Sequence, residues 1–384
     1  MSPSEEEDVV LKVLHTADWH LGRRFQSFDE EDERKLTRAR IEAVERLLHT
    51  ADQYQVDAML CAGDLFDQPN PPSDAVEALL QVFRKQQRWT GPILLLPGNH
   101  DPLTPTSVYR ENGPMRNRLP DHVHVVDRDD FTFSIGDNAV VYAVPCRSQS
   151  GQDDPTLKIP KREPDDDRIR IGMVHGQTFH YAGYETNFPI GTDATKRCEL
   201  DYMAIGDTHS FRNVADDGTP PMVYPSAPEP TTFGEKDAGF AALVLFRRRP
   251  RGPTVRQEAI ARWKWSRETC RSLEAVRELM ARDDLNTMVL KLTLDLKVTV
   301  KERHELEQLL VELKGSTACH GKVGILRIDS QRIESDTSGL EDELAGAPEV
   351  LRKVAAELRA AEGEDQEVAT QALQHLYRLV RELQ

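Results

Sequence analysis

The sequence has 384 residues and a formal net charge of −16 at pH 7. This length predicts one large core with smaller additions, because single hydrophobic cores stop growing near ~250–300 residues. The acidic start and the lack of any run of about 18 apolar residues argue against a secretory signal and a membrane span. Five dispersed cysteines argue against a zinc knuckle and a disulfide framework, so we expect a cytoplasmic protein without membrane association.

The negative charge bears on nucleic-acid binding, because surfaces that follow DNA phosphates usually carry excess lysine and arginine. Acidic residues cluster, however, in segments that need not touch a substrate. Residues 331–384 alone hold 12 acidic and 6 basic residues, a net charge of −6. The charge therefore lowers the expectation of DNA binding without excluding it.

Up to about residue 246, short apolar runs rich in β-branched residues alternate with helical patterns, which is typical of an α/β domain with buried strands. Eight runs are predicted as strands: Leu11–Thr16, Ala58–Ala62, Ile93–Pro97, Val123–Val126, Ala139–Val144, Ile169–His175, Tyr202–Gly206 and Gly239–Phe246. Helices are expected at Arg38–Tyr54 and Asp74–Gln87, where apolar residues recur at helical spacing.

The rest of the chain predicts two smaller parts. Arg247–Pro253 combines arginines with two prolines and is predicted to be a domain boundary. Beyond it, strand patterns at Met288–Val300 and Val323–Ile328 flank a helical pattern at Lys301–Lys314, which indicates a small β-α-β unit.

A polar linker then precedes two helical patterns, Val350–Leu358 and Val368–Leu383, and the second has one apolar stripe. We therefore predict three parts, at residues 8–246, 255–330 and 345–384.

Potential metal ligands follow the predicted strands at five places. They are Asp18-Trp19-His20, Gly63-Asp64-Leu65-Phe66-Asp67, Gly98-Asn99-His100-Asp101, His175-Gly176 and Gly206-Asp207-Thr208-His209. Each alone is explained equally well as a polar turn or a structural histidine, whereas five in order are much harder to explain in this way. Because loops at the carboxyl edge of a buried sheet converge, we expect these side chains to meet at one site.

The types of side chain indicate the metal. Carboxylate, imidazole and amide ligands suit a pair of Mn²⁺ or Fe²⁺ ions better than a structural zinc site, which favours thiolates. Two such ions can clamp a phosphate ester and supply the nucleophile for its hydrolysis. That chemistry needs one carboxylate that bridges both ions, and Asp64 is the best candidate.

Taken together, the five motifs resemble the signature of calcineurin-like metallophosphoesterases over the first 246 or so residues. The segments His15–Gly22 (HTADWHLG), Gly63–Asp67 (GDLFD) and Gly98–Asp101 (GNHD), followed by a small second domain, are similar to DNA double-strand-break-repair nucleases of the SbcD type. The resemblance implies an α/β fold: a sandwich of two β-sheets flanked by helices, with a small β-α-β cap domain and a C-terminal helical pair.

The resemblance also implies roles for individual residues. One ion would be held by Asp18, His20, Asp64 and His209, and the other by Asp64, Asn99, His175 and Asp207. His100 would be a catalytic imidazole outside the ligand set, and Asp101 would orient it. The family usually has histidine where this chain has Asp207, and an oxygen ligand there favours Mn²⁺ or Mg²⁺.

The function implied by the resemblance is a Mn²⁺-dependent DNA exonuclease, endonuclease or both, acting in DNA end processing and repair. Residues 255–330 would help to select DNA, and residues 345–384 would dock on an SbcC-like ATPase of the SMC family or on another DNA-translocating ATPase. Amphipathic helices are common, however, so packing of this tail within the chain itself remains an alternative. The nuclease would form a homodimer through the helices predicted near the first two motifs.

Two other functions remain open. The same metal centre also serves phosphodiesterases and phosphatases that act on small molecules or phosphoproteins, because the fold does not determine the substrate. Alternatively, the metal site has decayed and the chain is a scaffold for an ATPase partner, an interpretation that Asp207 alone supports.

Overall fold

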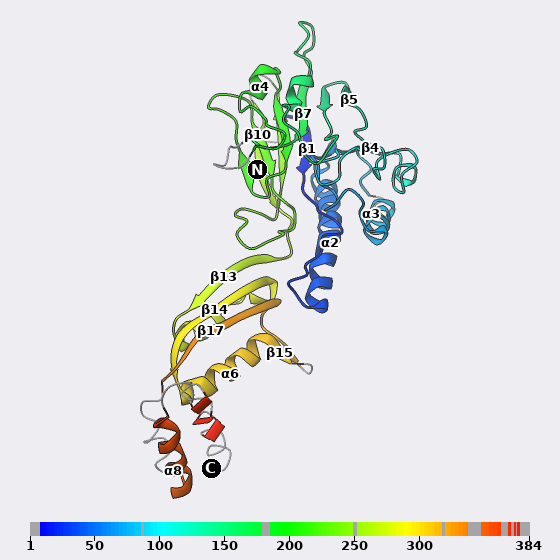
Figure 1. Cartoon of the computed structure of the whole chain (residues 1–384). Coiled ribbons are helices and arrows are strands. Elements are labelled where there is room, and N and C mark those ends of the chain that lie inside the picture. The colour runs from blue at the N-terminus through cyan, green and yellow to red at the C-terminus, as the bar shows by residue number, and fades with distance from the viewer. Residues whose placement is uncertain are drawn as a thin grey trace. The chain divides into compact units, whose positions relative to one another are not determined.

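The computed structural model describes residues 8–85, 88–178, 185–248, 252–316, 319–336 and 347–361, together with six residues between 368 and 376. The chain divides into two compact units, with the boundary between Trp263 and Lys264 (Figure 1). Among the described residues, no helix combines the length and the apolar character needed to cross a bilayer.

Two six-stranded sheets form the first unit (Figure 1). The first has the order β12-β11-β1-β2-β3-β4, with bounds β1 Val9–Thr16, β2 Ala58–Cys61, β3 Ile93–Leu95, β4 Val123–Val125, β11 Phe240–Arg247 and β12 Thr254–Ala259. The second has the order β5-β6-β7-β8-β10-β9, with bounds β5 Phe131–Ile135, β6 Ala139–Ala143, β7 Ile169–His175, β8 Tyr202–Gly206, β9 Phe211–Asn213 and β10 Met222–Pro225. The two-sheet fold predicted from the sequence is confirmed.

Alternation along β1 shows how the layers pack. Leu11 and Val13 belong to the hydrophobic cluster shared by the two sheets, whereas Leu14 belongs to the cluster on the opposite face. That opposite face is covered by α2 (Glu30–Tyr54) and α3 (Ser73–Lys85). Each buried aliphatic side chain stabilises the fold by ~1.5–3 kcal/mol relative to an exposed one, so these layers hold the motif-bearing strand ends firmly.

The helix α2 begins eight residues before the predicted start at Arg38. The Asp29 side chain accepts hydrogen bonds from the amides of Glu31 and Asp32, which caps the helix, and the first turn is acidic. The acidic run at Asp29–Glu33 is therefore explained as a helix start. The helix α3 matches its prediction, except that residues 86–87 lie outside the described residues.

The second unit contains a parallel sheet of order β13-β14-β17. Its main elements are β13 Lys264–Cys270, α5 Leu273–Met280, β14 Met288–Thr299, α6 Val300–Lys314 and β17 Ile325–Asp336, with a hairpin of β15 Gly315–Ser316 and β16 Cys319–His320. A capping box between Thr299 and Glu302 starts α6. The strands β14 and β17, with α6 between them, form the β-α-β unit that the sequence predicts.

The boundary between the units differs from the predicted one. Residues 254–259 form β12, which pairs antiparallel with β11, so they belong to the first unit. The proline-containing segment predicted as a domain boundary instead connects two adjacent strands of one sheet. The remaining short helices are η1 Arg116–Arg118, η2 Pro155–Lys158, α4 Ala194–Arg197 and η3 Leu285–Thr287.

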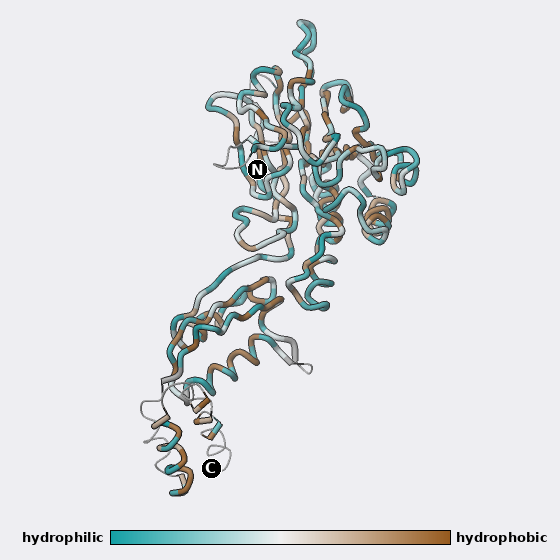
Figure 2. The backbone as a smooth tube through the Cα atoms, viewed as in Figure 1, coloured by the Kyte–Doolittle hydropathy of each residue, from teal (hydrophilic) through white to brown (hydrophobic). Residues whose placement is uncertain are grey.

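The tail contains α8 (Glu349–Arg359), which matches the helical pattern expected from Val350. In Figure 2, hydrophobic and hydrophilic residues alternate along this helix. Its Ala355 packs in a buried cluster with Leu373 and Leu376. The second predicted helix, Val368–Leu383, lies largely outside the described residues.

Candidate metal centre

The candidate ligands lie at the ends of five strands, β1, β2 and β3 in the first sheet and β7 and β8 in the second. Hydrogen bonds join the loops that follow them. The amides of Asp18 and His20 donate to the carbonyl oxygens of Gly63 and Asp64, each at 3.0 Å. The amide of Asp207 donates to the Asp18 carboxylate at 3.0 Å, which links the two sheets. The predicted convergence of strand ends is therefore present in the structure.

The backbone of these loops is unusual. Asp18, His20 and Asp64 have φ angles of 57°, 44° and 55°, in the left-handed region that residues other than glycine rarely adopt. Such a conformation costs on the order of 1–3 kcal/mol and persists only where the surroundings enforce it. Here the packed strands next to these loops enforce the left-handed backbone conformation. As a result, the side chains of Asp18, His20 and Asp64 converge on one site.

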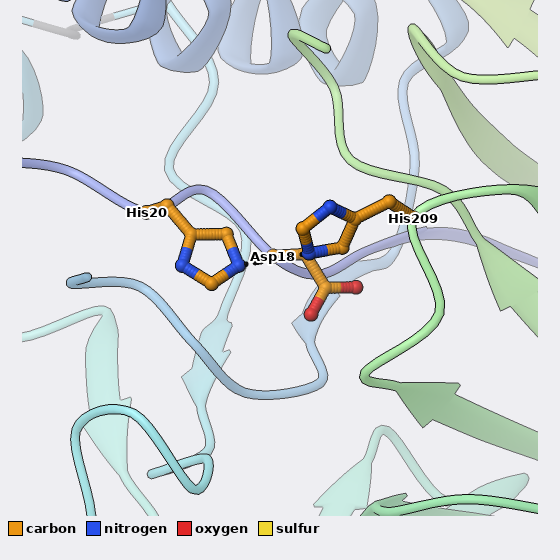
Figure 3. Close-up of side chains that lie close together, drawn as sticks. All are labelled: Asp18, His20 and His209. Atoms are coloured by element: carbon orange, nitrogen blue, oxygen red, sulfur yellow. Dashed lines mark hydrogen bonds between the residues drawn. The ribbon is translucent and has the colours of Figure 1, made fainter. Parts of the chain in front are cut away.

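The first group of side chains is Asp18, His20 and His209 (Figure 3). One potential ligand atom from each lies within 4.8 Å of the others. The Nε2 atoms of the two imidazoles are 2.9 Å apart. Asp18 and His20 are buried, while His209 is partly exposed, so the group is open on the His209 side.

The second group is Asp18, Asp64 and His175, and all three are buried. His175 Nε2 lies 3.4 Å from Asp64 Oδ1 and 2.8 Å from the side-chain oxygen of Asn99. The other carboxylate oxygen of Asp64 lies 3.8 Å from His20 Nε2. Asp64, a member of the second group, thus has one carboxylate oxygen near His175 and the other near His20 of the first group, which suits a bridging carboxylate; Asp18 belongs to both groups.

Two glycines allow this close approach. Gly63 has φ 100°, and a Cβ atom there would collide with the ring of His175. A Cβ atom on Gly98 would collide with the carboxylate of Asp64. The glycines of the second and third motifs therefore make room for ligands from other motifs.

Burial dominates the electrostatics of the site. It raises the pKa of the Asp18 carboxyl to about 7 and raises the pKa of Asp207. Burial alone would lower the pKa of His175, but the carboxylates of Asp64, Asp18 and Asp207, with Asp64 the largest contributor, together outweigh burial and raise that pKa to about 10. Three carboxyl groups so close together destabilise one another when ionised, and bound cations would relieve that cost.

The imidazoles are also prepared for metal binding. His175 Nδ1 hydrogen-bonds to the Ala62 carbonyl at 2.8 Å and His209 Nδ1 to Glu235 Oε1 at 2.7 Å, whereas His20 Nδ1 lies 3.3 Å from Asp67 Oδ1 outside hydrogen-bond geometry. A hydrogen on Nδ1 leaves the Nε2 lone pair free for a metal. The donor set of carboxylate, imidazole and amide oxygen therefore fits divalent cations.

Asp207 lies differently from the other candidates. Among the described residues, the groups of converging histidine and carboxylate side chains do not include it. Its amide contacts Asp18, and its carboxylate accepts a long hydrogen bond of 3.4 Å from Gln177 Nε2. The Asp207 side chain is thus beside the centre, and its role as a ligand stays a prediction.

His100 and Asp101 differ from expectation in one respect. The ring of His100 is held through Nδ1 by the carbonyl oxygen of Asp67 at 2.9 Å. Asp101 instead accepts hydrogen bonds from the amides of Phe66 and Gly98, each at 2.9 Å, and from the hydroxyl of Tyr109 at 2.5 Å. Asp101 therefore braces the loops of the second and third motifs, and the orienting role expected of it falls to the Asp67 carbonyl.

One positioning group that the sequence motifs did not predict is Arg40. This buried arginine of α2 donates to the carbonyl oxygens of Trp19 and His20 at 2.9 and 3.2 Å, and to those of Glu229 and Pro230 at 3.1 and 3.3 Å. It joins the loop of His20 to the segment after β10. A signal was present, because Arg40 interrupts the apolar face of its helix.

The comparisons with known proteins agree with this geometry. The family model described as calcineurin-like phosphoesterase matches residues 11–211, which is more than half of the chain. The chain belongs to this family. The converging ligand groups lie at the strand ends of the matched region, where the chemistry of a metal-dependent phosphoester hydrolase would need them.

Three relatives are similar to parts of this chain. The SbcD component of the nuclease SbcCD from Escherichia coli is 41% identical over 92 residues, covering 24% of this chain and 21% of the relative. The same component from Rhodobacter capsulatus is 33% identical over 179 residues, covering 43% and 39%. The uncharacterized metallophosphoesterase YhaO from Bacillus subtilis is 26% identical over 223 residues, covering 56% and 52%. The chain thus spans between about a fifth and a half of the length of these relatives.

Proposed function

We propose that the chain is a Mn²⁺-dependent DNA nuclease that processes DNA ends together with an SbcC-like ATPase of the SMC family. The observation that carries the proposal is that two of the three relatives above are components of the SbcCD nuclease. The buried ligand groups around Asp64 support the catalytic part of the proposal, because their donor atoms suit hard divalent ions.

The residues have separate tasks in this proposal. Asp18, His20 and His209 would hold one ion, and His175 with Asn99 would hold the other, with Asp64 between them and Asp207 completing the second set. When bound, such ions act as Lewis acids on the phosphate ester and supply the nucleophile for its hydrolysis.

His100 has a task of its own. Its Nδ1 hydrogen is donated to the Asp67 carbonyl, which leaves Nε2 free to exchange a proton. The half-buried ring adjoins Asn99, so it can reach the substrate from beside the ligands. We assign it the protonation of the leaving oxygen.

The second unit and the tail have the partner roles. The β-α-β unit at Met288–Asp336 would select DNA. Val350 and Val354 of α8 keep 70% and 39% of their surface exposed, and this apolar face is the proposed docking site for the ATPase.

A phosphodiesterase acting on small molecules is the second candidate. The net charge of −16 favours it, since a DNA-binding protein usually carries an excess of basic residues. The similarity to YhaO, which covers 56% of the chain, is compatible with either substrate class.

The experiment incubates the purified chain and Mn²⁺ with labelled linear, hairpin and single-stranded DNA, and with bis(p-nitrophenyl) phosphate as a generic diester. Asp64→Ala is the control, because it removes the carboxylate between the two ligand groups. We expect the wild-type chain to cleave DNA and the Asp64→Ala variant to leave it intact. Hydrolysis of the generic diester without cleavage of DNA would favour the small-molecule function, and no hydrolysis with any divalent ion would favour the scaffold.

A further inference from the structure

We propose that Glu235 is a positioning residue that fixes the His209 imidazole for one of the two ions. The inference rests on the metal centre of the proposed function and extends it to a residue outside the five motifs. Glu235 lies in the segment between β10 and β11, 26 residues after His209.

The contact itself is short and shielded. Glu235 Oε1 accepts a hydrogen bond from His209 Nδ1 at 2.7 Å. The side chain of Glu235 is 10% exposed and that of His209 22% exposed, so little water competes for either group. A hydrogen bond to a charged acceptor is stronger than one to a neutral acceptor, especially away from water.

Thr231 fixes the carboxylate in turn. Its amide donates to Glu235 Oε2 at 2.8 Å, and its hydroxyl donates to Oε1. Both carboxylate oxygens of Glu235 are therefore bound by Thr231, which is only four residues away in the chain. The Thr231 hydroxyl also lies 3.2 Å from His209 Nδ1. The carboxylate can hardly rotate without breaking these bonds, so the imidazole is held in one orientation.

These bonds fix the direction in which the Nε2 atom of His209 points. With the hydrogen on Nδ1, the lone pair of His209 Nε2 points toward His20, in the group of Asp18, His20 and His209. His175, in the other group, has only the neutral carbonyl oxygen of Ala62 behind it. Loss of Glu235 should therefore weaken the binding of the ion near His209 and leave the binding of the other ion unchanged.

The test counts bound Mn²⁺ on the full chain by equilibrium dialysis and electron paramagnetic resonance, so that the readout does not depend on turnover. We expect two ions on the wild-type chain. In Glu235→Gln, one ion should bind about 10–100-fold more weakly while the other is unchanged, as is typical when a partner behind a ligand is lost. Glu45→Gln, which removes an exposed carboxylate on α2, is the charge-matched control and should match the wild type.

Thr231→Val is the second variant, and it carries the test if Glu235→Gln does not fold. It keeps the carboxylate but removes the hydroxyl, so we expect a smaller loss at the same ion. Unchanged binding of both ions in the folded variants would overturn the proposal. An equal loss of affinity for both ions would also overturn the proposal, because such a loss would show a general structural effect. A wild-type chain that binds no ion would instead refute the metal centre itself.

Discussion

The Nε2 atoms of His20 and His209 lie 2.9 Å apart, although 189 positions separate the two residues in the chain. Their Nδ1 atoms each face a carboxylate oxygen, of Asp67 and of Glu235. If both rings carry their hydrogen on Nδ1, the two Nε2 lone pairs point at each other. This repulsive arrangement is stabilised when a cation binds both lone pairs, and it connects the two halves of the chain's first unit at one site.

Removing the ring of His100 should separate catalysis from metal binding. We expect His100→Ala to keep both ions and to lose turnover by roughly 10²–10⁴-fold, the usual contribution of a proton-transfer group. Steady-state hydrolysis and Mn²⁺ titration of the same preparation measure the two effects. His49→Ala, at an exposed position on α2, is the control. Loss of an ion in His100→Ala would make His100 a ligand.

Restoring the family residue at position 207 should change the choice of metal. We expect Asp207→His to lower the preference for Mg²⁺ relative to Mn²⁺, because imidazole nitrogen replaces a hard anionic oxygen. Titrations with each metal measure this, with Asp216→His at an exposed site as control. Asp207 has φ 108°, so thermal unfolding must show that the variant folds. Identical titration curves would mean that residue 207 is not a ligand.

Arg40 should matter more for stability than its charge suggests. Arg40→Met leaves four buried carbonyl oxygens without their donor, so we expect a loss of at least about 1–3 kcal/mol in the free energy of unfolding. Urea unfolding without metal measures it. Arg38→Met is the matched control, because its side chain is 80% exposed on the same helix, and it should stay within about 0.5 kcal/mol of wild type. Equal effects of the two substitutions would contradict this role.

Gly63 should tolerate no side chain. Gly63→Ala combines the cost of positive φ with a collision against His175, so it should destabilise the fold and weaken metal binding. Gly218→Ala isolates the first effect, because Gly218 has φ 76° and nothing lies within 4 Å of the added Cβ. We expect the Gly218 variant to lose about 1–2 kcal/mol of stability and no metal. Equal metal binding by both variants would refute the collision.

The sequence predicted the strands that carry the ligands, because buried strands have continuous apolar runs. It missed β5, β9, β10, β12 and β13, the short hairpin β15-β16 and the helix α5, for physical reasons. The strands β9, β10 and β5 have only three, four and five residues, and β12 and β13 are partly exposed edge strands of mixed polarity, so none has a long apolar pattern. The start of α2 was also missed, because its first two turns are polar and its signal is the Asp29 cap.

The same distinction holds at the site. Side chains that are candidates to bind metal directly follow strand ends and form recognisable motifs, whereas the groups behind them depend on tertiary contacts. Glu235 lies 26 residues from His209 in a polar segment, and Arg40 contacts carbonyl groups, which carry no sequence signature. Asp101 belongs to a motif, but its partners became clear only from the packing of Tyr109 and the neighbouring amides.

The most direct test of the two-metal centre is anomalous scattering from crystals of the full chain soaked in Mn²⁺. We predict two peaks on either side of the Asp64 carboxylate, one near His20 and His209 and one near His175 and Asn99. A crystal of Asp64→Ala treated in the same way should lose at least one peak. A single peak in the wild-type crystal, or none within reach of Asp64, would contradict the two-metal centre.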